Sequence, residues 1–202
     1  MYKRQVQDRA IRDAIAMQEA LGLPIVTDGE FRRGGWSRGF LNAVEGFDFR
    51  PSKLTFRNDD GFSTASPAPL ATKRVRRARP IVTEDFKFVK SVATKPAKVT
   101  MPTPSHMHFG QFKDAVDPKV YPDVEMYWND MIAVFQQEIT DLYAAGCRYL
   151  QLDEVPLALL CDNNIRAVSY THLDVYKRQA VPRCRQSNRP QRSHRLRRAL
   201  GL

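Results

Sequence analysis

The most constraining feature of the sequence is a long amphipathic segment that leads into a short apolar run ending in acids. Apolar side chains recur at spacings of three and four between Pro122 and Gly146, which predicts one helix with one buried face. Pro122 suits the first helical position, and Gly146 suits the helix end. The next run, RYLQLDE (148–154), predicts a strand whose far end carries Asp153 and Glu154.

The same order of helix and strand occurs twice more, nearer the N-terminus. Residues 6–21 predict a helix, and the run LPIVTDGE that follows predicts a strand ending in Asp28 and Glu30. Residues 83–93 predict a second helix, capped by Thr83, and residues 98–101 predict a buried strand before a proline-rich loop.

Helices that alternate with strands favour an α/β fold with a parallel sheet. Strands with polar far ends suit part of a TIM (β/α)8 barrel, in which the chemistry lies on the loops after the strands. A doubly wound sheet also fits the alternation, but no G-x-G-x-x-G motif follows any strand.

The stretch 47–81 interrupts this pattern with aromatic residues and turn formers, which predicts an insertion of one or two β-hairpins. It ends in the basic run KRVRRAR, from Lys73 to Arg79. We expect a solvated or partly paired strand face there, and phosphate binding is the alternative.

Four acids stand at two predicted strand ends: Asp28, Glu30, Asp153 and Glu154. Acids in such positions can hold a substrate ammonium, accept hydrogen bonds or act as a base. Alternatively, they cap the next helix or pair with Arg32 and Arg33. The residue types and their spacing leave both interpretations open.

Histidines and cysteines give no recognisable metal site. His106 and His108 form an H-x-H pair, but no residue is clearly placed as a third or fourth zinc ligand. Cys147, Cys161 and Cys184 form neither a C-x-x-C motif nor a disulfide framework. We therefore expect reduced thiols and a cytoplasmic protein.

The tetrapeptide YKRQ occurs twice, at residues 2–5 and 176–179. Residues 168–179 can be back-translated into the inverted end-sequence of a transposase that is used to build sequencing libraries. We therefore expect residues 1–5 and 168–179 to be translated adapter, and residues 180–202 to come from an unrelated or out-of-frame fragment. A native segment that repeats by chance is the alternative.

The charge distribution agrees with that interpretation. The chain has a formal net charge of +10, whereas residues 6–167 contain 21 basic and 21 acidic residues. The basic tail has few large apolar residues and predicts a disordered or arbitrary segment. Nucleic-acid binding would require that tail to be native, so we expect no nucleic-acid partner. No apolar run is long enough to span a bilayer, so we expect no membrane partner.

Two stretches resemble a known family: VTDGEFRRGGWSRGFL (26–41) and EITDLYAAGCRYLQLDEVPLALLCD (138–162). They are similar to cobalamin-independent methionine synthases, and most of all to the short, single-barrel members related to the C-terminal catalytic domain. The resemblance covers residues 6–167. It implies a TIM barrel that transfers a methyl group from a methyl-folate-type donor to a thiol such as homocysteine, with a zinc ion binding that thiol.

The resemblance also assigns residues. Glu30 matches a carboxylate that contacts the amino acid, and Asp153 matches the acid that holds its amino group, with Asp28 and Glu154 ranked second. The family's zinc ligands, an H-x-C motif with a later Glu and Cys, lie downstream of the LDE strand, and no H-x-C occurs here. We therefore expect the middle of an enzyme, inactive alone and poorly soluble because its sheet is open.

Two further functions remain open from the sequence. One is another enzyme of the related barrel superfamily, such as a uroporphyrinogen-decarboxylase-like lyase or an alkyl-thiol transferase. The other is a basic nucleic-acid-binding protein that depends on residues 183–198.

Overall fold

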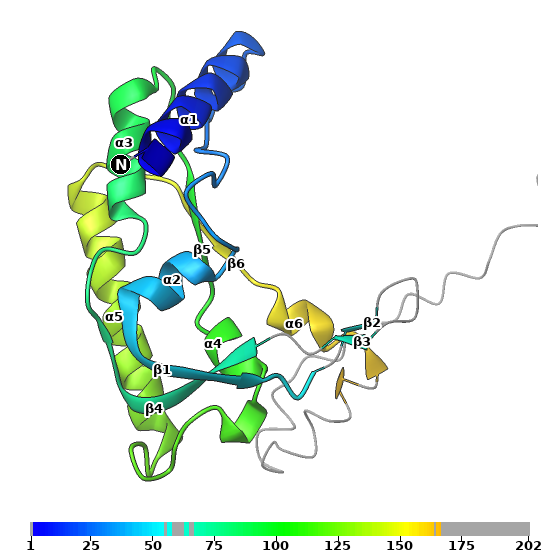
Figure 1. Cartoon of the computed structure of the whole chain (residues 1–202). Helices are drawn as coiled ribbons and strands as arrows, with labels where there is room; N and C mark the ends of the chain where they lie inside the picture. Colours follow the sequence, from blue (N-terminus) through cyan, green and yellow to red (C-terminus); the bar gives the residue numbers. More distant parts are fainter. Residues whose placement is uncertain (1, 55, 58–62, 65–66, 164, 167–202) are drawn as a thin grey trace, which may run out of the picture.

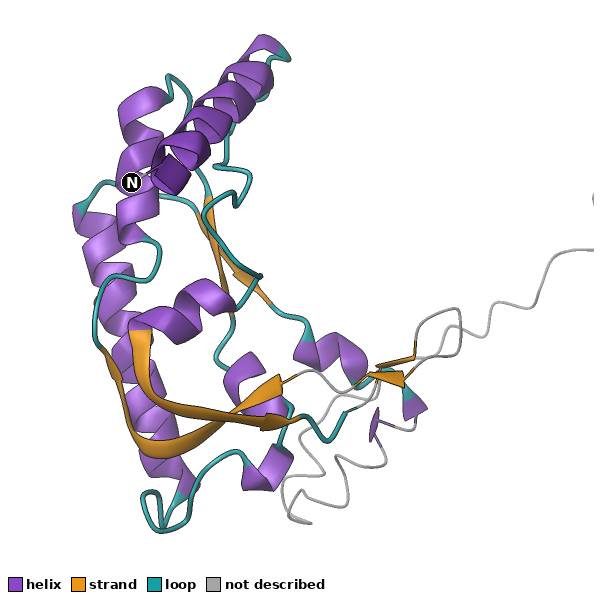
Figure 2. Cartoon of the chain, in the orientation of Figure 1, coloured by secondary structure: helices purple, strands orange, loops and turns teal. Residues whose placement is uncertain are grey.

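The computed structural model has a mixed α/β fold, and it describes residues 2–54, 56–57, 63–64, 67–163 and 165–166 (Figures 1 and 2). The predicted adapter at 168–179 and the tail at 180–202 lie outside the described residues. The elements run in this order: α1 (Tyr2–Ala20), α2 (Arg38–Ala43), β1 (Val44–Pro51), β2 (Phe56–Arg57), β3 (Ser63–Thr64), β4 (Pro67–Arg77), α3 (Thr83–Val92), β5 (Val99–Pro102), α4 (His106–Phe109), a 3-10 turn (Phe112–Asp114), α5 (Val124–Ala144), β6 (Leu150–Asp153) and α6 (Pro156–Leu159).

The predicted parallel arrangement is confirmed for β5 and β6. The two strands pair in parallel, with Val99 opposite Leu150 and Pro102 opposite Asp153. The run LPIVTDGE, predicted as a third strand, makes only a single parallel bridge, between Val26 and Ala97. The polar ends of these segments therefore lie at one edge of the sheet.

The long helix α5 forms the outer wall of the molecule (Figure 1). Tyr127, Met131, Phe135 and Leu142 of its apolar stripe are buried against β4 and the core, as the side-chain spacing predicts. Ile132, Ile139 and Tyr143, at the same spacing, are exposed, so the predicted buried face forms only in part. The helix begins at Val124, and Asp123 caps it by accepting from the Glu125 amide at 3.0 Å. The expectation that Pro122 is the first helical residue was wrong, because the aspartate one residue later provides a side-chain cap.

Helices α1 and α3 pack on each other at the other end of the molecule through a small apolar cluster of Ile11, Ile15, Val26 and Val89. Helix α1 begins at Tyr2, inside the segment 1–5 that was predicted as adapter, and the origin of that segment stays a prediction. The prediction that Thr83 caps α3 was wrong. Thr83 is the first helical residue, and its hydroxyl donates to the buried Glu138.

The predicted β-hairpins are confirmed, and their place as an insertion in a barrel stays a prediction. Strands β1 and β4 form a long antiparallel pair, and β2 pairs with β3. Gly46 has φ +107, and a Cβ there would lie 2.8 Å from the Arg74 carbonyl, so the irregular register at this point requires glycine. The long pair spans residues 44–77, slightly earlier than the predicted 47–81.

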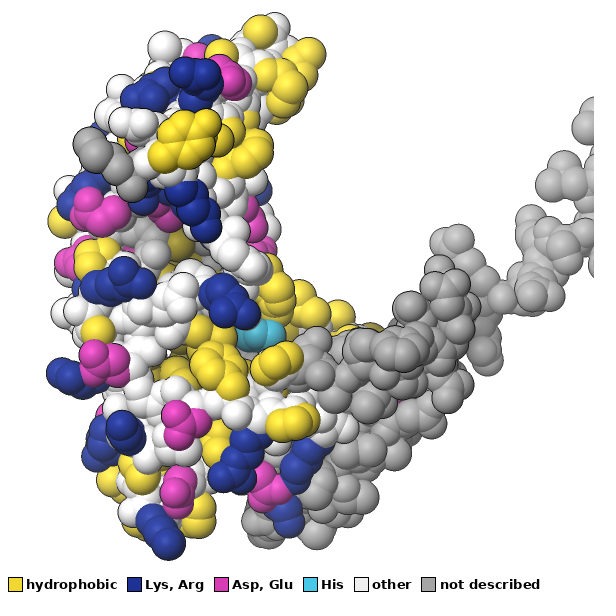
Figure 3. Space-filling model, in the orientation of Figure 1, with side chains coloured by type: hydrophobic (Ala, Val, Ile, Leu, Met, Phe, Trp, Pro, Cys, Tyr) yellow, Lys and Arg dark blue, Asp and Glu magenta, His cyan; other side chains and the backbone are white. Residues whose placement is uncertain are grey.

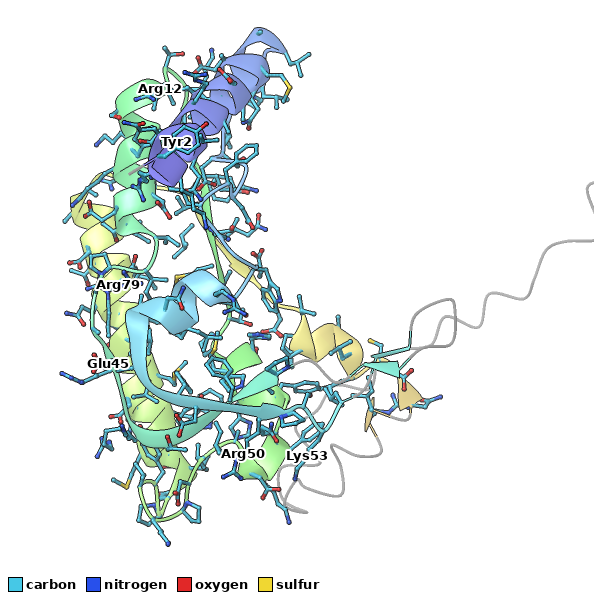
Figure 4. The ribbon with its side chains drawn as sticks, viewed as in Figure 1. Tyr2, Arg12, Glu45, Arg50, Lys53 and Arg79 are labelled. Atoms are coloured by element: carbon cyan, nitrogen blue, oxygen red, sulfur yellow. The ribbon has the colours of Figure 1, made fainter. Side chains whose placement is uncertain are left out.

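Most arginines of the basic run form ion pairs with acidic side chains or donate hydrogen bonds to backbone oxygens. This is what we expect of a partly paired strand face. Arg74 forms a fork with Asp130, and Arg76 pairs with Glu45 at 2.5 Å. Arg77 pairs with the buried Glu138 at 2.6 Å. Figure 4 shows Glu45 and Arg79 at the outer side of the molecule, away from the parallel strands.

The elements together form an open crescent (Figure 3). Helices α1, α3 and α5 follow its outer side, while β5, β6 and α6 line its inner side (Figure 1). Within the described residues, no helix is both long enough and apolar enough to cross a bilayer.

Candidate functional site

A polar cavity of about 330 Å³ lies at the edge where the parallel strands end. Its lining combines acids, a lysine and neutral hydrogen-bonding side chains: Thr27, Asp28, Glu30, Lys98, Thr100, Gln151 and Asp153. The structure thus brings together three of the four acids singled out from the sequence. Hereafter we call this the acid cavity.

The two-residue period of β-strands explains how this lining forms. Val99 and Met101 of β5 are buried on one face, so Lys98 and Thr100 point to the other face, toward the cavity. Gln151 and Asp153 follow the same alternation along the neighbouring strand β6.

A tight turn places Glu30 at the cavity. Gly29 and Glu30 both have positive φ, +63 and +59, a conformation that costs free energy for a residue with a side chain. The Asp28 carboxylate stabilises this turn by accepting from the Glu30 amide at 3.0 Å. The side-chain carboxylate of Glu30 accepts a hydrogen bond from the Thr100 hydroxyl at 2.7 Å.

Arg33 fixes the Glu30 carboxylate. Its buried guanidinium lies 2.9 Å from both the Glu30 carboxylate and the Thr100 hydroxyl, and it also donates to the Thr100 carbonyl. The ion pair suggested from the sequence therefore forms between Glu30 and Arg33. Arg32 instead binds Asp8 and Asp85, away from the cavity.

Asp28 and Asp153 differ in their surroundings. Asp28 is 6% exposed, and burial raises its pKa above the usual value, against the opposing effects of the Glu30 amide and Arg33. Asp153 is half-buried, and its Oδ1 accepts from the Gln151 amide at 2.6 Å. The cavity therefore contains one carboxylate that is costly to ionise and another that is held by a neutral amide.

Glu154 does not line the acid cavity. It accepts from the Ser105 hydroxyl at 2.6 Å and from the Leu157 amide at 2.9 Å, so it caps α6. Burial raises the pKa of Glu154, but these hydrogen bonds outweigh burial, and the net shift is downward. The capping role left open by the sequence is thus the one that the structure gives to Glu154.

A second, more apolar cavity of about 200 Å³ lies between the hairpin insertion and α6. Trp36 and His106 line it, with ring centroids 4.0 Å apart. Burial lowers the pKa of His106 to about 4, against a smaller opposing effect of Glu154, so this imidazole is neutral at pH 7. Figure 3 shows hydrophobic side chains beside a histidine on the inner side of the crescent.

The described histidines and cysteines do not fit a zinc ion. Zinc requires about four converging ligands. His108 packs among aromatic rings, with its ring centroid 5.3 Å from that of Trp128, and Cys147 is buried at the end of α5. Within the described part of the chain, no group of three or more histidine, cysteine, aspartate or glutamate residues is placed to hold a metal.

Sequence reasoning missed four polar residues of the acid cavity: Thr27, Lys98, Thr100 and Gln151. For the last three a signal was present, because each lies an even number of residues from a strand-end position and so shares its face. The alternation identifies the face, but not the neighbour that each side chain contacts.

Comparison with known proteins shows the family to which this chain belongs. Residues 1–183 match the family described as cobalamin-independent synthase, catalytic domain. The chain belongs to this family. The match begins within residues 1–5, which we predicted as adapter, and ends within residues 180–202, which we predicted as an unrelated tail. The origin of both segments stays a prediction.

Relatives of the synthase family include proteins of Bacillus subtilis and Aeromonas salmonicida. The uncharacterized protein YxjH of B. subtilis is 32% identical over 168 residues, which are 82% of this chain and 43% of YxjH. A 5-methyltetrahydropteroyltriglutamate–homocysteine methyltransferase of A. salmonicida is 28% identical over 76% of this chain and 19% of that protein. This synthase-family chain therefore spans less than half the length of either relative.

Two solved structures described as vitamin-B12-independent methionine synthases also match the fold of this chain. A putative vitamin-B12-independent methionine synthase from Listeria monocytogenes has a TM-score of 0.61 and 26% identity, over 85% of this chain and 52% of that one. A B12-independent methionine synthase from a Shewanella species, solved with selenomethionine, has a TM-score of 0.56 over 83% of this chain and 49% of that one. At 24% identity, the second likeness supports the fold alone.

Proposed function

We propose that this chain provides the amino-acid-binding wall of a methyltransferase that acts on a thiol amino acid such as homocysteine. Family membership and the methyltransferase activity for which the A. salmonicida relative is named support the reaction class. The observation that carries the proposal is the gathering of Asp28, Glu30 and Asp153 on one cavity.

These three carboxylates suit an ammonium group. Each uses one oxygen in contacts with the described residues: Asp28 with the Glu30 amide, Glu30 with Thr100 and Arg33, and Asp153 with Gln151. The second oxygen of each makes no contact recorded among the described residues, and an α-ammonium group has three N–H donors to offer. Charged hydrogen bonds of this kind are the strong ones in proteins.

The wider reaction belongs to the same proposal. We propose that β5, β6 and the segment at Val26 are part of a (β/α)8 barrel, since they are parallel and carry their polar residues at one end. A methyl-folate-type donor has a flat ring system, and the apolar cavity beside Trp36 offers an aromatic surface for it. The described residues alone do not form a metal site.

Substitution of Asp153 tests this function. We expect Asp153→Asn to weaken the binding of L-methionine to the full chain by roughly ten- to a hundredfold, the value of one charged hydrogen bond. Isothermal titration calorimetry measures the affinity. Asp13→Asn is the matched control, because Asp13 is an exposed acid on α1 outside the cavity. Equal affinities for the two variants would contradict the proposal.

A further inference from the structure

Strand β6 has one open edge. It pairs with β5 on one side, and within the described residues no strand pairs with its other side. The Tyr149 and Asp153 carbonyls accept from backbone amides on the β5 side at 3.2 and 3.3 Å. Because backbone groups alternate along a strand, the amides and carbonyls of Leu150 and Leu152 point to the open edge. Such unpaired groups are a template for another strand.

An apolar groove of about 290 Å³ lies beside this edge, between α5 and β6. Ile139 and Tyr143 line it from α5 and are 44% and 65% exposed, and Leu150 lines it from β6. Leu152 lies two residues further along the same face of β6 and is 42% exposed. A strand that pairs with this edge must therefore also bring apolar side chains to this face.

The residues along the open edge are complementary to themselves when two copies run in opposite directions. In an antiparallel pair centred on Gln151, Leu150 lies opposite Leu152 of the second copy. Arg148 then lies opposite Glu154 of the second copy, and both side chains are exposed in the single chain. A pair centred on Leu150 or Leu152 would instead place one of these charges opposite a leucine, so the sequence favours one register.

We propose that two copies of this chain form a dimer through β6, in an antiparallel pair centred on Gln151. Leu150 and Leu152 of each copy then exchange backbone hydrogen bonds with the other, and their side chains cover the two grooves. The two sheets become one four-stranded sheet, with both α5 helices on the same face. Such an interface is two-fold symmetric and closes on itself. It does not depend on the proposed function of the acid cavity.

A second copy suits this edge better than the basic end of the same chain. Residues 180–202 contain seven arginines, no acid and few large apolar residues, so they offer little to an apolar groove. A second copy offers leucines to the groove and a carboxylate to Arg148. Cover by a later segment of the same chain would leave the protein monomeric, which separates the two arrangements in solution.

Sedimentation velocity on the full chain tests the dimer. We expect the parent to sediment with twice the mass of one chain. Leu152→Lys places two ammonium groups beside the pairing and should raise the dimer dissociation constant at least about tenfold. Arg148→Glu creates two pairs of like charges and should weaken the dimer about tenfold, less so at high salt. Met17→Lys is the matched control, because Met17 is an exposed apolar residue on α1, and it should stay dimeric.

A cysteine at the two-fold axis tests the register. Gln151→Cys, with Cys161→Ser and Cys184→Ser to remove other thiols, places two sulfurs opposite each other at a Cα separation of about 4.5 Å. We expect a disulfide-linked dimer after mild oxidation, seen on a non-reducing gel. Gln137→Cys in the same background lies on an exposed position of α5 and should not form this link. This measurement stays decisive if Leu152→Lys fails to fold, which circular dichroism would reveal.

The outcomes decide the inference in either direction. A parent chain that is monomeric would overturn it. A dimer that Leu152→Lys does not weaken, or that Gln151→Cys does not link, would place the interface elsewhere and overturn the role of β6. A dimer that Leu152→Lys dissociates and Gln151→Cys links would support it.

Discussion

At Asp28, the negative charge that would bind a ligand ammonium lowers the stability of the fold. Burial raises the pKa of this carboxyl, so its folded-state pKa lies above that in the unfolded chain. The folded state then binds the proton more tightly. The carboxyl's contribution to stability is therefore present at low pH and is lost as the pH rises through the raised pKa.

Asp28→Asn should separate these two effects. At pH 7 we expect the free energy of unfolding to rise by about 1 kcal/mol, because a buried charge is removed while an oxygen remains to accept from the Glu30 amide. The gain should shrink as the pH falls toward about 4 and vanish near about pH 3, where Asp28 is mostly protonated in both states. Urea denaturation across pH measures this, and a variant less stable than the parent at pH 7 contradicts it.

The strand-end acids show which site residues could be predicted from the sequence and which contacts could not. The sequence identified Asp28, Glu30 and Asp153 because polar residues after an apolar strand share one edge of a parallel sheet. It did not identify the contact between Arg33 and Thr100, which are 67 residues apart. Such a contact depends on tertiary packing, and local periodicity contains no information about it.

At the scale of elements, one buried carboxylate joins α5, α3 and β4. Glu138 is fully buried, and it accepts from three consecutive backbone amides, 81 to 83, at 2.8–2.9 Å. It also accepts from the Thr83 hydroxyl and pairs with Arg77 of β4. The start of α3 and the end of the hairpin insertion are therefore held by the same side chain.

Glu138→Gln should destabilise the fold strongly. The change leaves Arg77 with only the half-exposed Asp141 as its charge partner and turns an amide donor toward other donors, which we expect to cost about 3 kcal/mol. Chemical denaturation measures the loss. Gln137→Ala, an exposed neighbour on the same helix, should change stability by less than about 0.5 kcal/mol. A loss as small as that in Glu138→Gln would show that the buried network contributes little.

Helices were predicted better than strands. The main helices lie within a few residues of their predicted bounds, because helical periodicity is a local property. The segment at Val26 forms only one bridge, since a strand also requires a partner that lies beside it over several residues. Local apolar character alone cannot provide that partner.

At the scale of the whole molecule, the crescent leaves apolar side chains exposed along α5 and the β6 strand. Ile139, Tyr143, Tyr149 and Leu152 are each more than 40% exposed. An apolar surface of this kind favours association, so the expected poor solubility stays a prediction with a structural reason.

The fold gathers three strand-end acids at one cavity beside β5 and β6, on the inner side of the crescent. Parallel strands bring acids from the segments after Val26 and after Leu150 to the same edge, although these segments are far apart in sequence. The central claim is that these acids hold the ammonium group of a thiol amino acid.

A crystal structure of the full chain grown with selenomethionine tests that claim most directly, because the anomalous signal of selenium locates the ligand. We predict that its amino nitrogen lies within about 3.2 Å of at least two carboxylates among Asp28, Glu30 and Asp153. Selenomethionine bound elsewhere, or bound with its amino group directed away from these acids, would contradict the account.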